Sequence, residues 1–206
     1  MSEFTGFVQL GFRHIVSLDA LDHILFLLVL AAIYQGRDWK GSLWVISAFT
    51  VGHSITLAMA ATGTLLIPQR LTEFLIPLTI VATGLHNILT RGRRVGIASR
   101  YRPLFAGVFG LVHGAGFGGY LQQLFLGSVV GPLFGFNLGI ELGQIVVLAA
   151  AGAALMGLDR LLSVARVRAP TLSRSPTLSP FSLRVVTVSL VVVAVATGMA
   201  VARRPW

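Results

Sequence analysis

Residues 18–34 read LDALDHILFLLVLAAIY, and three of the first six positions are ionisable whereas positions 24–33 are wholly apolar. A helix needs about 20 consecutive, mainly apolar residues to cross a bilayer. An ionisable side chain at bilayer depth costs about 2.5–3.5 kcal/mol on insertion scales, so such residues usually serve a function. The stretch therefore predicts a transmembrane helix that carries a polar site at its start.

Five further apolar segments follow, and in the whole 206-residue chain 55% of residues are hydrophobic and 11% are charged. An ordinary soluble domain carries about 25% charged residues. The later segments cover about 42–65, 71–89, 103–124, 129–157 and 183–202. We therefore predict an all-α integral membrane protein, with one transmembrane domain over 1–206 and a bundle of about six transmembrane helices.

Two segments lie outside these spans. From Phe4 to Ile15, apolar residues recur at i, i+3 and i+4 steps, which predicts a short amphipathic helix at the interface or folded back against the bundle. No signal peptide is indicated, so we expect the first span to be retained. The segment 163–182 repeats Pro-Thr-Leu-Ser among arginines and is interpreted as a flexible cytoplasmic loop.

The positions of the basic residues predict the orientation. Of the 16 lysines and arginines, twelve fall in the first, third and fifth connections and four on the other side. Cytoplasmic loops are enriched in such residues, so we expect a multi-pass protein of the cell (inner) membrane with both termini on the non-cytoplasmic side. The same rule explains the net charge of +9, so we expect the lipid bilayer as a partner and no nucleic acid.

The first span offers a group of metal-binding side chains. Asp19, Asp22 and His23 fall within about one helical turn, and His14 precedes them. Carboxylate oxygens and imidazole nitrogens suit Ni, Co, Zn or Fe, whereas Cu(I) favours sulfur, and the chain has no cysteine. A structural alternative stays open, in which Asp19 caps the helix and the Asp22-His23 pair closes the end of the bundle.

Polar residues also lie within the later spans. His53 has the alternative of a simple interhelical hydrogen bond, and the glycines at 107, 110, 114 and 118 around His113 have a structural use in close helix packing. Glu141 needs a cation, a hydrogen-bond partner or a proton, and no Lys or Arg lies within a span core. This accumulation of acids and imidazoles predicts a cation site.

Several of these residues stand in motifs that succeed one another along the first five spans. They include Asp22-His23-Ile24-Leu25-Phe26, His53-Ser54-Ile55-Thr56-Leu57, Gly110-Leu111-Val112-His113-Gly114 and Glu141-Leu142-Gly143-Gln144. In this order the chain resembles the HupE/UreJ family of hydrogenase and urease accessory membrane proteins, which are related in motif style to nickel/cobalt transporters. The resemblance implies uptake of a divalent transition metal, usually nickel, with Asp22, His23, His53, His113 and Glu141 as the matching functional positions.

We therefore predict a non-enzymatic membrane permease for a divalent transition metal ion, with Ni²⁺ favoured over Co²⁺, Zn²⁺ and Fe²⁺. An intramembrane zinc-dependent hydrolase stays open, with Glu141 as general base and Ser54 nearby. So does a metal-binding accessory or scaffold protein that transports nothing. A homo-oligomer and metalloenzyme maturation partners stay open too. The predicted metal ligands are His14, Asp19, Asp22, His23, His53, His113 and Glu141. Residues predicted along the pathway or in support of the ligands are Ser54, Glu73, His86, Asn87, Asn137 and Gln144.

Overall fold

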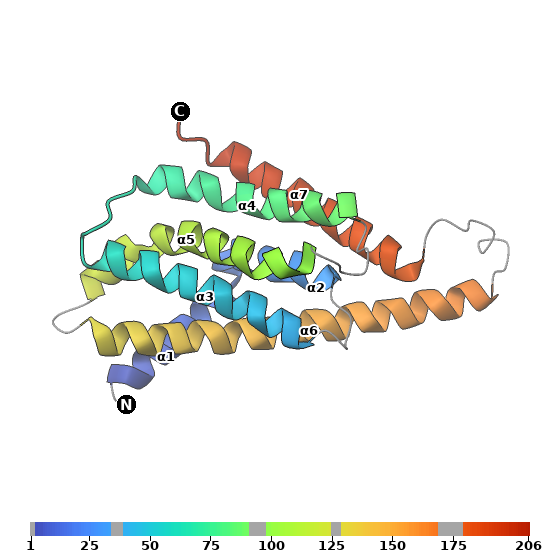
Figure 1. Ribbon diagram of the computed structural model, residues 1–206, viewed down its shortest axis with the longest axis horizontal. Helices are drawn as coiled ribbons and strands as arrows, with labels where there is room; N and C mark the ends of the chain where they lie inside the picture. The colour runs from blue at the N-terminus through green and yellow to red at the C-terminus, as the bar shows by residue number, and fades with distance from the viewer. Residues whose placement is uncertain (1–2, 34–38, 91–97, 125–128, 169–178) are drawn as a thin grey trace.

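The computed structural model describes residues 3–33, 39–90, 98–124, 129–168 and 179–206, and these parts are helical with no β-strand among them. The helices run roughly along one long axis (Figure 1). They are α1 (Glu3–Val16), the short 3₁₀ helix η1 (Leu18–Ala20), α2 (Leu21–Ile33), α3 (Trp39–Ala61), α4 (Gln69–Thr90), α5 (Ala98–Leu124), α6 (Val130–Arg168) and α7 (Pro180–Ala202). The all-α prediction is confirmed for the described residues.

Four of these helices are long and apolar enough to cross a membrane, namely α3, α4, α6 and α7. The bent pair of α1 with η1 and α2 makes a fifth candidate if it is one span, and its two parts meet at 58°. Helix α5 is 27 residues long and rich in glycine, and it is not among the candidates. The described chain is thus a membrane-type helical fold with four or five candidate spans, where the sequence predicted about six.

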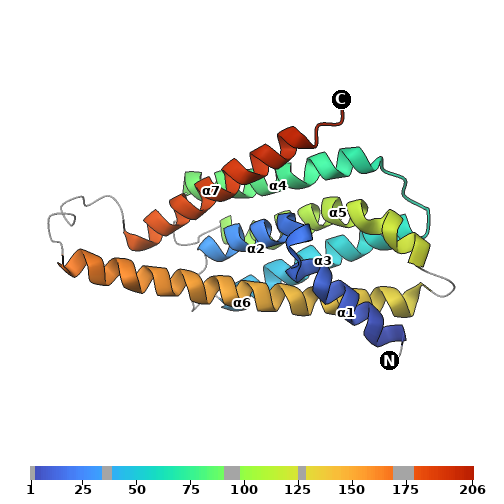
Figure 2. The same ribbon diagram turned by 180° about the vertical axis from the view of Figure 1, so that it is seen from behind.

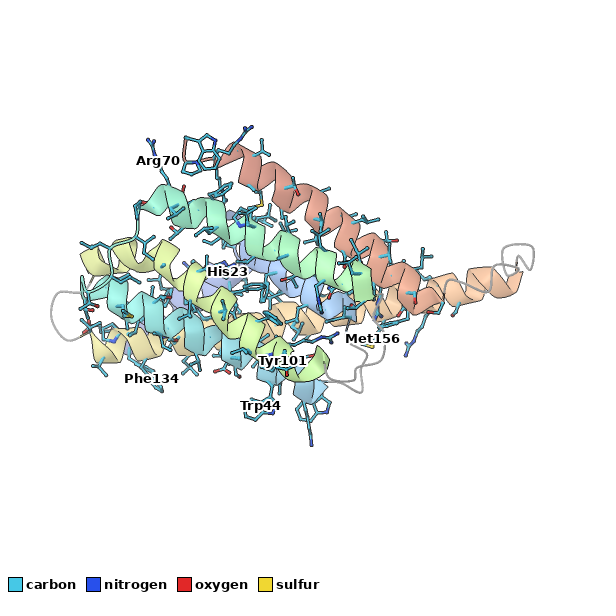
Figure 3. The ribbon with its side chains drawn as sticks, turned by 45° about the horizontal axis from the view of Figure 1, so that its top comes forward. His23, Trp44, Arg70, Tyr101, Phe134 and Met156 are labelled. Carbon is cyan, nitrogen blue, oxygen red and sulfur yellow. The ribbon has the colours of Figure 1, made fainter. Side chains whose placement is uncertain are left out.

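The outer surface of the bundle is apolar. Trp44 is 72% exposed and Phe134 is 65% exposed, and both point away from the bundle, whereas His23 lies inside it (Figure 3). Large aromatic side chains exposed on several helices are unusual for a water-soluble monomer. Hydrocarbon around these helices explains them, as expected for a membrane protein.

Helices α3 and α5 approach each other closely because glycines lie between them. A Cβ atom at Gly52 would collide with the backbone carbonyl of Gly107, and one at Gly114 would collide with the carbonyl of His53. Small residues let membrane helices come into backbone contact. This contact places His53 of α3 against Gly114 of α5, the residue that follows His113.

Helices α1 and α6 make a second contact of the same kind. A Cβ atom at Gly11 would collide with the carbonyl of Phe136, and one at Gly139 would collide with the carbonyl of Val8. Of the two placements left open for the N-terminal helix, the structure therefore shows the one against the bundle, where α1 lies along α6 (Figure 2). His14, near the end of α1, faces the interior as a result.

The bend between α1 and α2 follows from Ser17. Its backbone is extended, with φ −72° and ψ 142°, and its hydroxyl accepts a hydrogen bond of 3.1 Å from the backbone N–H of Asp19. Serine is among the preferred residues at helix N-caps for this reason. At the other end of α2, the side chains of Asn87 and Arg184 donate to backbone carbonyls of Val29 and Ala32. Both ends of this short helix are therefore held by polar contacts.

Both termini lie towards the same end of the long axis (Figures 1 and 2). An even number of crossings has this consequence, and the termini were predicted on one side. Helix α6 continues to Arg168 and α7 begins at Pro180, so the segment 163–182 contains less loop than predicted. Residues 169–178 of that segment lie outside the described residues.

Candidate metal site

Four of the five histidines lie together in the interior, although they come from four helices. The ring centroid of His23 lies 4.8 Å from that of His14, 5.3 Å from that of His113 and 6.1 Å from that of His53, and the His14 and His53 centroids are 6.4 Å apart. Two imidazoles that bind one metal ion at about 2.0–2.1 Å have ring centres about 4.5–6 Å apart. The distances from His23 to His14 and to His113 fall within this range, whereas the two longer distances lie beyond it.

Each of these histidines has at least one buried ring nitrogen that lacks a hydrogen-bond partner. The atoms are Nε2 of His14, Nε2 of His23, both ring nitrogens of His53 and Nδ1 of His113. Buried polar atoms without a partner are rare in native proteins and call for an explanation. A neutral imidazole nitrogen is the commonest metal ligand in proteins, so a metal ion could occupy one free nitrogen of each histidine, although the second nitrogen of His53 would stay without a partner.

The donor atoms do not yet converge. Within the described ranges, no group of three or more His, Asp or Glu side chains is already arranged to hold a metal ion. The rings of His14 and His113 each lie at a ligand-like distance from that of His23, whereas the ring of His53 is farther from it. A shared ion would therefore require these side chains to move.

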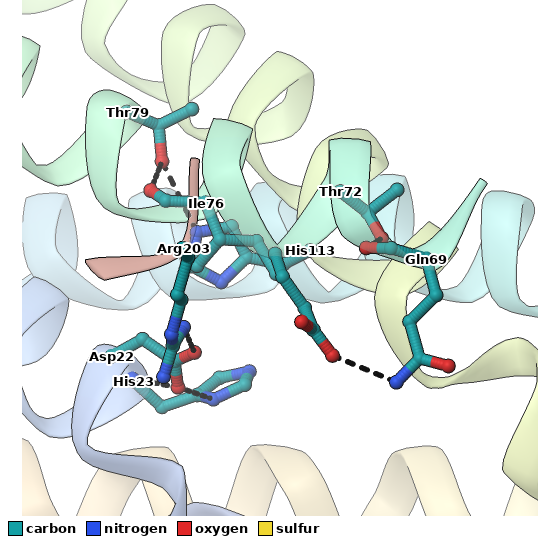
Figure 4. A network of polar contacts seen from close by, with 9 residues as sticks. Asp22, His23, Gln69, Thr72, Ile76, Thr79, His113 and Arg203 are labelled. Carbon is teal, nitrogen blue, oxygen red and sulfur yellow. Dashed lines mark hydrogen bonds and ion pairs between the residues drawn. The ribbon is translucent and has the colours of Figure 1, made fainter. Parts of the chain in front are cut away.

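Asp22 orients His23. Its Oδ1 lies 3.0 Å from Nδ1 of His23 and also accepts a hydrogen bond of 2.9 Å from the His23 backbone N–H (Figure 4). If Nδ1 carries the proton, the lone pair of the neutral ring is on Nε2, which is the unpartnered nitrogen. Carboxylates commonly hold metal-binding histidines in this way and raise their basicity. Asp22 thus supports a candidate ligand through Oδ1, and its own role as a ligand stays a prediction.

Thr79 of α4 plays the corresponding part for His113. Its hydroxyl oxygen lies 3.1 Å from Nε2 of His113 and 2.7 Å from the carbonyl oxygen of Ile76 (Figure 4). The hydroxyl donates its single proton to that carbonyl and accepts from Nε2–H of the ring. This tautomer leaves the lone pair on Nδ1 of His113, again the nitrogen without a partner.

An open cavity of about 550 Å³ reaches the histidines, and Arg203, which follows α7 near the C-terminus, is among its lining residues. His14, His23 and His113 line it, while His53 is fully buried behind them. Its charged lining is mixed and comprises Arg13, Asp19, Asp22, Glu73 and Arg203. A hydrated cation can therefore reach three of the four imidazoles through a polar opening.

A second cavity has a volume of about 220 Å³. Phe26 lines this cavity, stacks on Phe49 at 4.9 Å between centroids, and lies 6.0 Å from His113. Phe49 in turn lies 5.0 Å from His113 and 6.0 Å from His53. Phe26 therefore links the histidines to the second cavity, and Phe49 packs against Phe26 on the side of the histidines.

Two of the predicted supporting residues line this second cavity and do not meet the four histidines. His86 is exposed and Asn87 is buried, with its amide donating to Val29. The first cavity holds the remaining predicted acid of α4, Glu73, which accepts a hydrogen bond of 2.7 Å from Gln69. The structure thus divides these supporting residues between two separate spaces.

The polar face of α6 contacts α3. Ser47 donates to Glu141 at 2.7 Å, and Thr50 donates to Gln144 at 2.9 Å. Glu141 thus has a hydroxyl partner, and it is not among the residues that line the first cavity. Asn137, one turn earlier, has a buried Oδ1 atom without a partner.

Two further predicted residues make local contacts. Asp19 is exposed at the first cavity and accepts a hydrogen bond of 3.0 Å from the hydroxyl of Ser17. The N-cap of η1 is Ser17 and not Asp19. Ser54 donates to the carbonyl of Thr50 on its own helix at 2.6 Å. Neither side chain is brought to the free nitrogens of the four histidines by these bonds.

Sequence reasoning missed two residues that touch the candidate site. Thr79 had a visible signal, because it shares a helical face with Thr72, Thr83 and His86. Arg203 had none, because it lies 181 positions after Asp22, yet its Nη1 atom is 3.5 Å from Oδ2 of that carboxylate. The prediction that the buried acids lack basic partners therefore does not hold for Asp22.

One of three comparisons with known proteins found a match. The sequence model of a family described as "HupE / UreJ protein" matches residues 1–203, which is almost the whole chain. No curated protein and no solved structure matches it.

Proposed function

The chain belongs to the HupE/UreJ family, and from this premise we propose that it is a membrane permease for a divalent transition metal ion. HupE/UreJ proteins are linked to nickel or cobalt through accessory or transport functions. Nickel is the favoured substrate and cobalt the second, because a cluster of imidazole nitrogens without sulfur suits both ions.

One observation carries the proposal. Four buried imidazoles with unpartnered nitrogens lie where a candidate first span is broken, next to an open polar cavity. Broken membrane helices often form the binding sites of transporters, because irregular backbone at membrane depth is tolerated where it lines a cavity. The break at Ser17 brings His14 and His23 from its two sides to the same point.

The proposed path begins in the first cavity. With both termini on the non-cytoplasmic side, this cavity opens outward, so the ion enters from outside and exchanges water for imidazole nitrogens. His14, His23 and His113 receive it, and His53 completes the set after the rings rotate. Release towards the cytoplasm would then lead past Phe26 and Phe49 into the second cavity, which contains His86.

The hydrolase that the sequence left open has less support. That reaction would need Ser54 or Glu141 close to a metal-bound water, but Ser54 bonds to its own helix and Glu141 bonds to Ser47. A metal-binding accessory role without transport uses the same histidines. Transport measurements therefore separate it from the permease.

The test compares matched histidine variants in reconstituted vesicles that contain a metal-sensitive dye. We expect His23→Ala and His113→Ala to abolish Ni²⁺ uptake and to weaken Ni²⁺ binding by the purified protein at least about tenfold. His86→Ala is the matched control, because it removes an imidazole outside the cluster, and it should retain Ni²⁺ binding.

Three other outcomes would be informative. Ni²⁺ binding without uptake by the unmodified protein would indicate the accessory role. Unchanged binding in His23→Ala and His113→Ala would exclude the histidine cluster as the site. Loss of binding in His86→Ala alone would move the site to the second cavity.

A further inference from the structure

We propose that Arg203 competes with the metal ion for the negative charge of Asp22, and that the ion pair between Arg203 and Asp22 lowers the affinity of the site for the metal ion. The inference rests on the proposed function, because it concerns the same histidines. It assigns a role to a residue at the end of α7 that belongs to none of the ligand positions.

The contacts place Arg203 directly behind a candidate ligand. Nη1 of Arg203 lies 3.5 Å from Oδ2 of Asp22, while Oδ1 of the same carboxylate holds Nδ1 of His23 at 3.0 Å. The Asp22 side chain is only 14% exposed and that of Arg203 is 34% exposed. One carboxylate is therefore shared between a guanidinium group and the imidazole that would bind the metal (Figure 4).

The chain after α7 is held in this position from a second direction. The Trp206 ring packs edge-on against the ring of Phe74 on α4, with 5.6 Å between centroids. The neighbouring Glu73 lines the first cavity together with Arg203. The chain end thus contacts α2 through Arg203 and α4 through Trp206, and Arg203 itself lines the cavity.

The charges then compete in a defined way. A divalent ion on Nε2 of His23 makes the ring more positive, so the ring draws more strongly on Asp22. Arg203 already neutralises that carboxylate, and its own positive charge repels an ion in the same cavity. Both effects weaken metal binding, and removing the charge of Arg203 should therefore strengthen it.

The experiment measures Ni²⁺ binding by the purified full chain with calorimetry. Arg203→Gln should bind Ni²⁺ about tenfold more tightly than the unmodified chain, as expected for a change to the group that supports a ligand. Arg203→Lys keeps the charge and should keep the original affinity. Arg204→Gln is the matched control, because Arg204 is an exposed neighbour whose Nε atom bonds only to the carbonyl of Val201 in the described contacts.

A second comparison tests whether the effect passes through Asp22. In the Asp22→Asn background, adding Arg203→Gln should change Ni²⁺ affinity much less than it does in the unmodified chain, since the shared carboxylate is gone. An equal gain in both backgrounds would mean that Arg203 acts on the ion without Asp22, which contradicts the proposed mechanism.

The results separate this inference from the proposed function. If the unmodified chain binds Ni²⁺ and Arg203→Gln has the affinity of Arg204→Gln, the inference is wrong and the metal site stands. If Arg203→Gln binds more weakly and Arg203→Lys restores binding, the ion pair supports the site and does not compete with the ion. If the unmodified chain binds no Ni²⁺, both proposals fail.

Discussion

The hydroxyl of Thr79 decides which nitrogen of His113 is available. It accepts from Nε2 of the ring and donates to the carbonyl of Ile76, so the lone pair of the neutral imidazole is left on Nδ1. Asp22 does the same for His23 with the opposite nitrogen. The chemistry of the candidate site therefore depends on residues that are not ligands themselves.

Replacing Thr79 tests whether its hydroxyl fixes the tautomer of His113. Thr79→Val keeps the shape but removes the hydroxyl, so His113 loses its fixed tautomer, and we expect Ni²⁺ affinity to fall by about 10- to 100-fold. Thr79→Ser should retain most of the affinity. The measurement is Ni²⁺ binding by the purified protein.

Thr83→Val is the control for that substitution. Thr83 lies one turn later, and its hydroxyl bonds to the carbonyl of Thr79 on the same helix. It should bind Ni²⁺ like the unmodified protein. Equal losses in Thr79→Val and Thr83→Val would show that α4 is sensitive to any such change, and the tautomer argument would be lost.

The four histidines that the structure gathers were all identified from the sequence, because an imidazole within an apolar span is conspicuous in one dimension. The side chains that pair with Asp22 and Glu141 were not identified from the sequence. Arg203 and Ser47 reach these acids from other helices, and such contacts depend on how far each helix is shifted along its neighbour. A hydrophobic pattern does not specify that shift.

At the level of the elements, glycines decide which helices touch. The sequence predicted that the glycines around His113 serve close packing, and Gly110 and Gly114 do face the backbone of α3. The sequence separated an N-terminal helix ending near Ile15 from a span beginning near Leu18, and the break at Ser17 lies between them. It did not predict the 58° angle, nor that the two parts together make one candidate span. The cap at Ser17 becomes recognisable only when its extended backbone is seen.

A pair of glycine substitutions tests the packing of α3 and α5. In Gly114→Ala the new methyl group meets the carbonyl of His53 and the hydroxyl of Thr56, so we expect a loss of about 1–3 kcal/mol in stability. Gly152→Ala in α6 meets nothing within 4 Å and should be neutral or stabilising by up to about 1 kcal/mol. Thermal unfolding in detergent measures both.

Both variants place alanine in a helix, so a difference between their stabilities reports the contact that the new methyl group makes and not helix propensity. If Gly114→Ala unfolds at the temperature of Gly152→Ala or above it, the contact between α3 and α5 is looser than described. A matching loss of Ni²⁺ binding in Gly114→Ala would further indicate that this contact positions His53.

At the level of the whole molecule, both termini lie towards the same end, and Arg203 near the C-terminus lines the first cavity. The distribution of basic residues predicts that this end is outside the cytoplasm, and nothing in the helical packing itself distinguishes inside from outside. Composition and hydropathy were sufficient to predict a helical membrane protein. They did not predict that the first candidate span is two helices, nor that α5 is less clearly a span.

The absence of cysteine from the natural chain makes the orientation directly testable. Leu66→Cys lies in the connection between α3 and α4, where Leu66 is 85% exposed, and Ser163→Cys lies at an exposed position near the end of α6. In intact cells, a membrane-impermeant thiol reagent should label Leu66→Cys only, and Ser163→Cys should react after the membrane is opened. The reverse pattern would invert the predicted topology and the direction of entry.

The stacked rings of Phe26 and Phe49 have a kinetic consequence. Phe26 lines the second cavity, and both rings lie within 6.0 Å of a histidine of the cluster, so the proposed route from the histidines to that cavity leads past them. Passage would then require the rings to separate in every cycle, as in a carrier that exposes its site to one side at a time. We therefore expect saturable, turnover-limited flux, with no single-channel current across a planar bilayer.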